Sequence, residues 1–181
     1  MKKFKILFIS FVLISGTVFA QKGHMKIEPS LVIAFPVEGT NTGFGINGTF
    51  FYGIDKNIDL TGTLGYITWS YSDFDASFSS IPFLVGGRYS FAVEGTITPY
   101  AAAELGFHFT SASFTIPSYS FGGSSFGGGT TSASSTEFGI GFGGGAYFQV
   151  SSSITIDGNL QFNIIGSSNY FAIRAGAVFE I

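Results

Sequence analysis

The residues from Ser153 to Asn163 alternate between apolar and polar side chains. The apolar set is Ile154, Ile156, Leu160 and Phe162, and the polar set is Thr155, Asp157, Asn159, Gln161 and Asn163. A β-strand sends successive side chains to opposite faces, so this segment predicts a strand with one apolar face and one strongly polar face. The pattern recurs along the chain in segments of about ten to twelve residues, a repeat typical of a transmembrane β-barrel.

The alternation defines eight segments, at residues 26–35, 43–54, 58–71, 81–91, 98–111, 136–150, 153–163 and 169–181. Connections after the second, fourth and sixth segments are short, whereas those after the first, third and fifth are longer. Short periplasmic turns and longer outer loops are typical of outer-membrane barrels, although the short connection at 166–168 departs from this trend. We therefore expect an all-β fold: an eight-stranded antiparallel up-and-down transmembrane β-barrel with both termini in the periplasm.

The N-terminus has the pattern of a secretory signal. Lys2, Lys3 and Lys5 precede an apolar run at 6–14, and Val18-Phe19-Ala20 supplies a cleavage site. The apolar run is too short for a comfortable membrane anchor, which is the alternative interpretation. We expect residues 1–20 to be a cleaved signal peptide and residues 21–181 to form the outer-membrane β-barrel domain.

Charge is scarce in this chain. Charged residues make up 10% of it, against roughly a quarter in soluble domains. Beyond the signal, five basic residues stand against eleven acidic ones, a net charge of −6 that argues against a nucleic-acid partner. No later apolar run approaches about eighteen residues, the length of a transmembrane helix, whereas a closed barrel pairs its backbone in lipid without helices. The absence of cysteine excludes disulfides and thiolate metal sites.

A secreted soluble barrel with an apolar ligand cavity is the main alternative from outside the membrane. Its outer surface would then be the face that carries Asp59, Arg88, Glu104, Asp157 and Arg174. On the second, fourth and sixth segments that face consists mostly of Gly, Ser, Thr and Ala, a poor coat for a soluble protein. The charge scarcity and this coat favour the membrane barrel.

The polar faces supply a set of ionisable residues that we expect inside the barrel: Glu28, Asp59, Arg88, Glu104, His108, Glu137, Asp157 and Arg174. The interior of an eight-stranded barrel is just wide enough for side chains to fill. Buried charges have to be paired, so we expect each arginine to be held by carboxylates in a polar ion-pair network. The alternative is a narrow pore gated by rearrangement of these pairs. We also expect Tyr52, Tyr66, Trp69, Tyr71, Tyr89, Tyr100 and Tyr170 to form interfacial belts.

The connection at 112–135 is the longest, and it is rich in Ser, Thr and Gly. Our first interpretation is a flexible, uncharged loop. The alternative is a hairpin that continues the fifth and sixth strands beyond the membrane and offers an edge or aromatic surface to a partner. The candidate surface-contact residues of that hairpin are Phe114, Tyr119, Phe121 and Phe126.

Catalysis is not predicted. His108, Glu104 and Ser111 lie on one strand, but alternation places Ser111 on the opposite face from the other two, so they cannot form a triad. The glycines at 139, 141, 143 and 145 resemble a phosphate loop only superficially, because neither a lysine nor a helix follows them. We expect no catalytic, cofactor-binding or metal site.

A family resemblance lies in the central hairpin, Ile81-Pro82-Phe83-Leu84-Val85-Gly86-Gly87-Arg88-Tyr89-Ser90-Phe91 followed by Thr98-Pro99-Tyr100-Ala101-Ala102-Ala103-Glu104-Leu105-Gly106-Phe107. It resembles the outer-membrane β-barrel domain family of small OmpA/OmpX-like proteins. The resemblance implies the fold of such a barrel and says little about activity. From the whole pattern we expect a cell-surface barrel of a Gram-negative-type bacterium, surrounded by outer-membrane lipid, with a structural or surface-interaction role. The resemblance also implies insertion by the barrel assembly machinery, which reads a C-terminal aromatic residue; here the last residue is Ile181 and the nearest aromatic is Phe179.

Overall fold

The structure of the chain is a computed structural model, which describes residues 23–37, 41–71, 76–121, 124–151, 154–166 and 168–181. These residues form eight strands and no helix. The strands are β1 (Met25–Pro36), β2 (Gly43–Asp55), β3 (Ile58–Tyr71), β4 (Ala76–Ser90), β5 (Ile97–Phe121), β6 (Ser124–Gln149), β7 (Ile154–Ile165) and β8 (Ser168–Glu180). The expected signal peptide lies outside the described residues.

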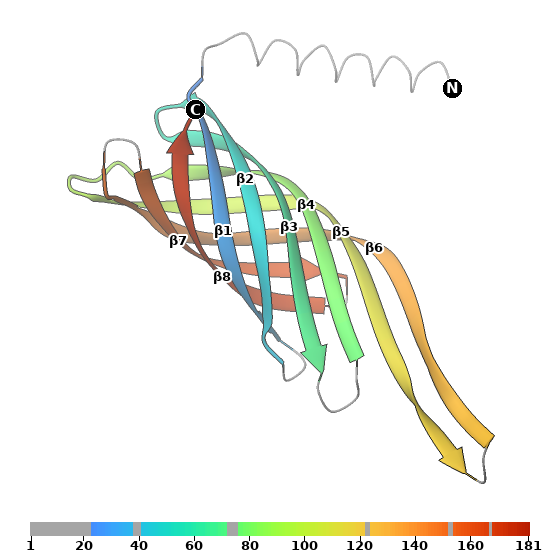
Figure 1. Cartoon of the computed structure of the whole chain (residues 1–181). Coiled ribbons are helices and arrows are strands. Elements are labelled where there is room, and N and C mark those ends of the chain that lie inside the picture. Colours follow the sequence, from blue (N-terminus) through green and yellow to red (C-terminus); the bar gives the residue numbers. More distant parts are fainter. Residues whose placement is uncertain (1–22, 38–40, 72–75, 122–123, 152–153, 167) are drawn as a thin grey trace, which may run out of the picture.

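Each strand pairs antiparallel with the next along the chain, and β1 pairs with β8 to close the barrel (Figure 1). Closure leaves no free sheet edge around the barrel wall, because the backbone groups of every strand meet a neighbour on both sides. Met25 and Glu180 therefore lie at the same end, which we call the terminal end. The predicted all-β, eight-stranded, antiparallel up-and-down barrel is confirmed.

Side chains alternate between the two faces of the wall as the sequence predicts. Leu31, Phe44 and Leu64 on three successive strands are 57–68% exposed on the outside. The interleaved Ser30, Asn47 and Thr63 are less than 7% exposed inside. The outer surface is thus a continuous apolar belt around a polar interior, which contradicts the soluble barrel with an apolar cavity. In the part of the chain that the structure describes, no helix has the length and apolar character to cross a membrane.

The strands extend further than the alternation predicts on one side of the barrel. β4 begins at Ala76 rather than at residue 81, and its register with β5 starts at Ala76↔Phe114. β5 and β6 stay in register from Ile97↔Phe148 to Phe121↔Ser124, so most of the expected flexible loop is a two-stranded hairpin. The apolar residues change phase between Phe109 and Phe114 and again at Pro117, so the alternation is not continuous with that of the membrane strand. The prediction of a flexible loop was wrong, and the alternative hairpin is what forms.

The hairpin projects well beyond the other strands at the end opposite the termini, which we call the hairpin end (Figure 1). The turns at the terminal end are short and locally stabilised. In one of them Lys56 donates its backbone N–H to Asp55 Oδ1 at 2.6 Å. The bend after Phe91 contains Gly95 at φ 128°, a backbone conformation that disfavours residues with a Cβ.

Candidate functional site

The interior of the barrel is layered along its axis. Charged side chains fill the half nearest the termini and the middle, amides and His108 follow, and an apolar cluster lies toward the hairpin end. Each layer draws its residues from several strands, because inward positions of neighbouring strands come level with one another in a barrel. The candidate site is therefore the lumen together with its opening at the hairpin end, which we call the mouth.

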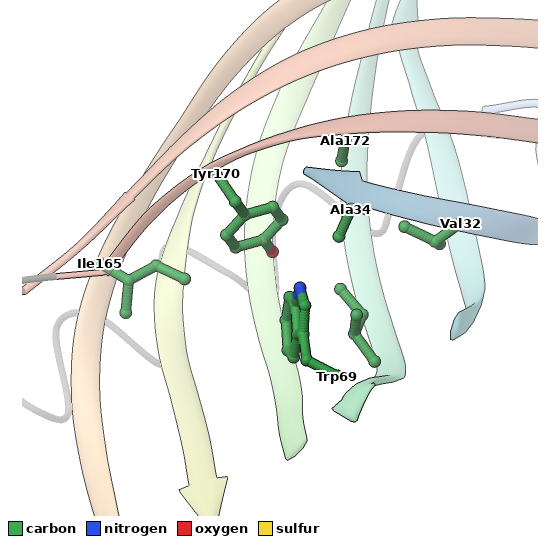
Figure 2. Packing of buried hydrophobic residues seen from close by; sticks show 7 residues of the cluster. Val32, Ala34, Trp69, Ile165, Tyr170 and Ala172 are labelled. Atoms are coloured by element: carbon green, nitrogen blue, oxygen red, sulfur yellow. The ribbon is translucent and has the colours of Figure 1, made fainter. Parts of the chain in front are cut away.

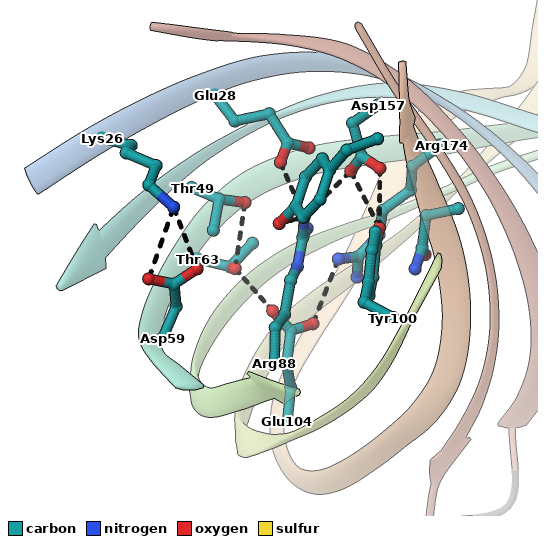
Figure 3. A network of polar contacts seen from close by, with 12 residues as sticks. Lys26, Glu28, Thr49, Asp59, Thr63, Arg88, Tyr100, Glu104, Asp157 and Arg174 are labelled. Carbon is teal, nitrogen blue, oxygen red and sulfur yellow. Dashed lines mark hydrogen bonds and ion pairs between the residues drawn. The ribbon is translucent and has the colours of Figure 1, made fainter. Parts of the chain in front are cut away.

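The first cluster is built around Arg88 on β4 (Figure 3). Its Nη1 donates to Glu28 Oε2, Asp157 Oδ2 and Tyr147 Oη, each at 2.9 Å. Tyr100 donates its hydroxyl to Asp157 Oδ1 at 2.8 Å. Guanidinium, both carboxylates and Tyr100 are almost fully buried, so charge pairing replaces hydration here.

Aromatic rings also contact the Arg88 guanidinium. The Arg88 Cζ atom lies 4.7 Å from the Phe51 ring centroid and 4.6 Å from that of Tyr100. Such contacts are strongest when the cation is desolvated, as it is here. Together the carboxylates and rings hold Arg88 across the lumen from β4 toward β1, β5 and β7.

The second cluster is built around Glu104 on β5. Arg174 Nη1 and Gln161 Nε2 donate to Glu104 Oε2 at 3.1 and 3.0 Å, and Thr63 Oγ1 donates to Oε1 at 2.7 Å. Thr63 in turn lies 3.2 Å from the Thr49 hydroxyl. Both oxygens of the buried carboxylate are thus satisfied by strands β3, β7 and β8.

Asp59 pairs with a lysine and not with either luminal arginine. Although it stands opposite Arg88 in the β3–β4 register, its carboxylate accepts from Lys26 Nζ at 3.1 Å. Lys26 belongs to β1 and is partly exposed at the terminal end. This pair closes the rim of the lumen above the Arg88 cluster.

His108 lies in the third layer, 1% exposed. Its Nδ1 is 3.3 Å from Ser80 Oγ on the neighbouring strand β4. A side chain at Gly139 would overlap the imidazole, so the glycine of β6 makes room for the ring. Likewise Gly145 leaves space for the Tyr100 hydroxyl. The described residues contain no group of three or more His, Asp or Glu side chains placed to hold a metal ion.

An apolar cluster lies between the polar layers and the hairpin end (Figure 2). Its members come from β1, β3, β7 and β8: Val32, Ala34, Ile67, Trp69, Ile165, Tyr170 and Ala172. The Trp69 ring lies 5.7 Å from that of Tyr170 and 5.4 Å from that of Phe78. Three of its members, Trp69, Ile165 and Tyr170, line the floor of an open cavity of about 830 Å³ at the hairpin end.

The structure brings seven of the eight predicted luminal residues to buried positions: Glu28, Asp59, Arg88, Glu104, His108, Asp157 and Arg174. Glu137 is the exception, because it is not fully buried and does not join the ion-pair network. It is half-buried beside the cavity and accepts from Ser135 Oγ at 3.3 Å, not from an arginine.

The predicted aromatic belts are only partly correct. Tyr66 and Tyr89 are exposed on the outer surface. Trp69, Tyr100 and Tyr170 point into the barrel and are at most 5% exposed, because they occupy inward positions of their strands. Tyr52 is buried against Gly23, and the side chain of Tyr71 lies outside the described residues.

Sequence reasoning missed two partners inside the lumen, Lys26 and Ser80. Ser80 was missed because the predicted fourth strand begins at residue 81, five residues after the start of β4, although position 80 faces inward like Arg88. Lys26 was missed because it sits at the start of the first strand, where a long side chain reaches the rim.

Of the candidate contact residues on the hairpin, Phe114 is 45% exposed and borders the cavity. The backbones of Tyr119, Phe121 and Phe126 lie in the β5–β6 ladder. Their side chains lie outside the described residues.

Comparison with known proteins gives a result for structure alone. No family profile matches the sequence, and no curated protein matches it. The barrel is similar to Neisserial surface protein A, with a TM-score of 0.58 and 18% identity over 87% of this chain and 96% of that one. It is similar to Ail of Yersinia pestis, with a TM-score of 0.61 and 18% identity over 89% of this chain and 100% of that one. The chain has the fold of small outer-membrane barrels.

A third similar structure extends this likeness beyond those two genera. It is a major outer membrane protein of Thermus thermophilus, with a TM-score of 0.61 and 12% identity over 87% of this chain and 99% of that one. At such identities the shared property is the barrel, whereas the residues that fill the lumen and mouth have to be interpreted from this chain itself.

Proposed function

We propose that this chain is a small integral outer-membrane protein, closed to solutes, whose β5–β6 hairpin contacts a partner at the cell surface. Outer-membrane lipid would surround the apolar belt, and the barrel assembly machinery would insert the chain after removal of residues 1–20. No catalytic activity is assigned to it.

The observation that carries the membrane part of the proposal is the inversion of polarity across the wall. Phe83, Phe107 and Ile140 are 48–54% exposed outside, while Arg88 and Glu104 are buried inside. A water-exposed surface of this kind would be a large aggregation-prone patch. In a bilayer the same belt matches lipid, and the closed barrel gives every strand a paired neighbour on both sides.

The hairpin supports the surface-contact part. Beyond Phe114, β5 has no register partner on β4 among the described residues, and β6 before Gly139 has none on β7. Both outer edges of the hairpin therefore present free backbone donors and acceptors, which suit strand addition by an extended segment. Residues 109–136 contain no charged side chain, so backbone pairing and apolar contact would dominate over charge.

Ail, one of the similar structures, is an attachment and invasion locus protein, and it has been crystallised with the heparin analogue sucrose octasulfate. Attachment fits the proposal for this chain as a class of role. A polysulfated ligand does not fit the hairpin, because residues 89–173 contain no lysine or arginine to bind it.

The test is to delete residues 118–130 and measure adherence. Phe114 and Thr131 are register partners, so Thr115, Ile116 and Pro117 would remain as a three-residue connection between them. In a non-adherent Gram-negative host, the full chain should increase adherence to polystyrene or cultured epithelial cells, and the shortened chain should not. Equal adherence of both, at equal surface amounts of folded barrel, would contradict the hairpin's role.

A narrow gated pore is the second candidate. Buried polar atoms without a protein partner occur in the lumen at Ser30, Asn47, Thr61, Asn159 and Asn163. Such groups are usually satisfied by internal water. Internal water in the lumen would favour a pore. The Arg88 cluster and the apolar cluster, however, block passage of solutes along the barrel axis.

A further inference from the structure

The cavity at the hairpin end is not used by the structural or hairpin roles above. It holds about 830 Å³ and is open to solvent, in the size range of sites for small organic molecules. Most strands contribute to its lining, and Trp69, Ile165 and Tyr170 of the apolar cluster form the floor that separates it from the lumen. A ligand that enters here would therefore stop at the mouth rather than pass through the barrel.

Aromatic side chains form one side of this cavity. Trp69, Phe78 and Tyr170 all line it, with the indole between the other two rings (Figure 2 shows Trp69 beside Tyr170). The Trp69–Tyr170 contact is edge-on, at 71° between ring planes. Ring faces grouped in this way attract organic cations, for which tryptophan is the strongest aromatic partner.

A carboxylate lines the same cavity. Glu137 makes no ion pair among the described residues, and its Oε2 packs against Gly166, next to the β7–β8 connection. Its register partner on β5, His108, turns to Ser80 instead. Glu137, Trp69 and Tyr170 line the same cavity, so one ligand of the cavity's size can contact both the carboxylate and the rings.

The charge that lines the cavity is negative. No lysine, arginine or histidine lines the cavity. Among the described residues that line the cavity, Glu137 is the one charged residue. Anions are therefore repelled, and a cation with an apolar body gains attraction both from the carboxylate and from the rings.

We propose that this cavity is a binding site for small organic ammonium compounds with an apolar body. The ammonium group would lie between Glu137 and the ring faces of Trp69 and Tyr170, and the apolar body would cover the floor and Phe78. The proposal concerns the folded barrel alone and does not depend on what the hairpin contacts.

The chain provides its own reporter, because Trp69 is the single tryptophan. The full mature chain, refolded in a maltoside detergent without an ammonium headgroup, is titrated with benzyltriethylammonium. Neutral N,N-diethylbenzamide and anionic 4-butylbenzoate are comparison ligands of similar size. Trp69 emission is followed, and equilibrium dialysis counts bound ligand independently of any optical change.

We expect saturable binding of the ammonium compound, with both comparison ligands at least about tenfold weaker. Glu137→Gln should raise the Kd for the ammonium compound by about tenfold through the loss of one ion-pair contact. Glu94→Gln, in the turn at the opposite end, is the matched control and should leave the Kd unchanged. Heat-modifiable migration on SDS gels verifies that each variant is folded.

Three outcomes would overturn the proposal. Equal affinity for the neutral amide would make the cavity a general apolar site. An unchanged Kd in Glu137→Gln would remove the carboxylate from recognition. Absence of saturable binding by dialysis would show that the cavity does not bind organic ammonium compounds.

Discussion

Arg88 and Asp157 meet at 2.9 Å inside the barrel, although 69 residues separate them and their strands, β4 and β7, share no ladder. The same guanidinium nitrogen reaches Glu28 on β1 at 2.9 Å. One side chain thus joins three parts of the wall through the lumen. Because all three charges are buried, removal of one leaves the others uncompensated.

We therefore predict that Arg88→Met lowers the free energy of unfolding by about 3–5 kcal/mol, the loss typical of a broken buried ion pair. Urea unfolding of the refolded barrel in detergent or vesicles measures it. Lys26→Met is the control, because Lys26 pairs with Asp59 at the partly exposed rim. Lys26 is partly exposed but Asp59 is buried, so removal of the lysine charge should lower the free energy by about 1–2 kcal/mol, less than Arg88→Met. Equal losses in the two variants would contradict the account of the cluster.

The plugged lumen predicts that the barrel does not conduct. Arg88 and Arg174 are each fixed by buried carboxylates, and the apolar cluster lies across the path toward the hairpin end. Purified protein in planar bilayers should show no channel openings under voltages at which a general porin in the same bilayer is open. Reproducible openings of the unaltered chain would favour the gated pore instead.

His108 should not support catalysis. The imidazole is 1% exposed, contacts Ser80, and is separated from lipid by the barrel wall. A lipid hydrolase needs its nucleophile and base where the substrate can reach them. We expect no release of fatty acid from phospholipid or lipid A by the purified barrel, and the same background for His108→Ala. Deacylation that disappears in His108→Ala would show an active site at this residue.

The alternation of apolar and polar residues was enough to predict the architecture. Leu31 outside and Glu28 inside follow from the two-residue period of a strand. The hairpin could not be predicted in the same way, since the alternation shifts by one residue at Pro117 and residues 122–135 are mostly Gly, Ser and Thr. Its ladder depends instead on the register that the barrel has already set between Phe109 and Thr136.

The luminal set was accessible to prediction as a group, but its pairing was not. Parity placed Arg88, Asp59 and Asp157 on inward faces, yet Arg88 pairs with Asp157 while Asp59 pairs with Lys26. Those choices depend on the stagger of the strands and on side-chain reach across the lumen, which one-dimensional spacing does not contain. The cavity at the mouth was likewise beyond the sequence, because it needs Glu137 and Tyr170 from strands that share no ladder.

The central claim, a closed barrel in the outer membrane, is tested most directly by fractionation of a Gram-negative host that expresses the full-length chain. The membrane fraction is run on SDS gels with and without boiling. The structure predicts sedimentation with the outer membrane and a band that shifts on boiling, because the closed ladder from β1 to β8 resists detergent until it is heated. A soluble periplasmic or secreted protein without a heat shift would contradict the account.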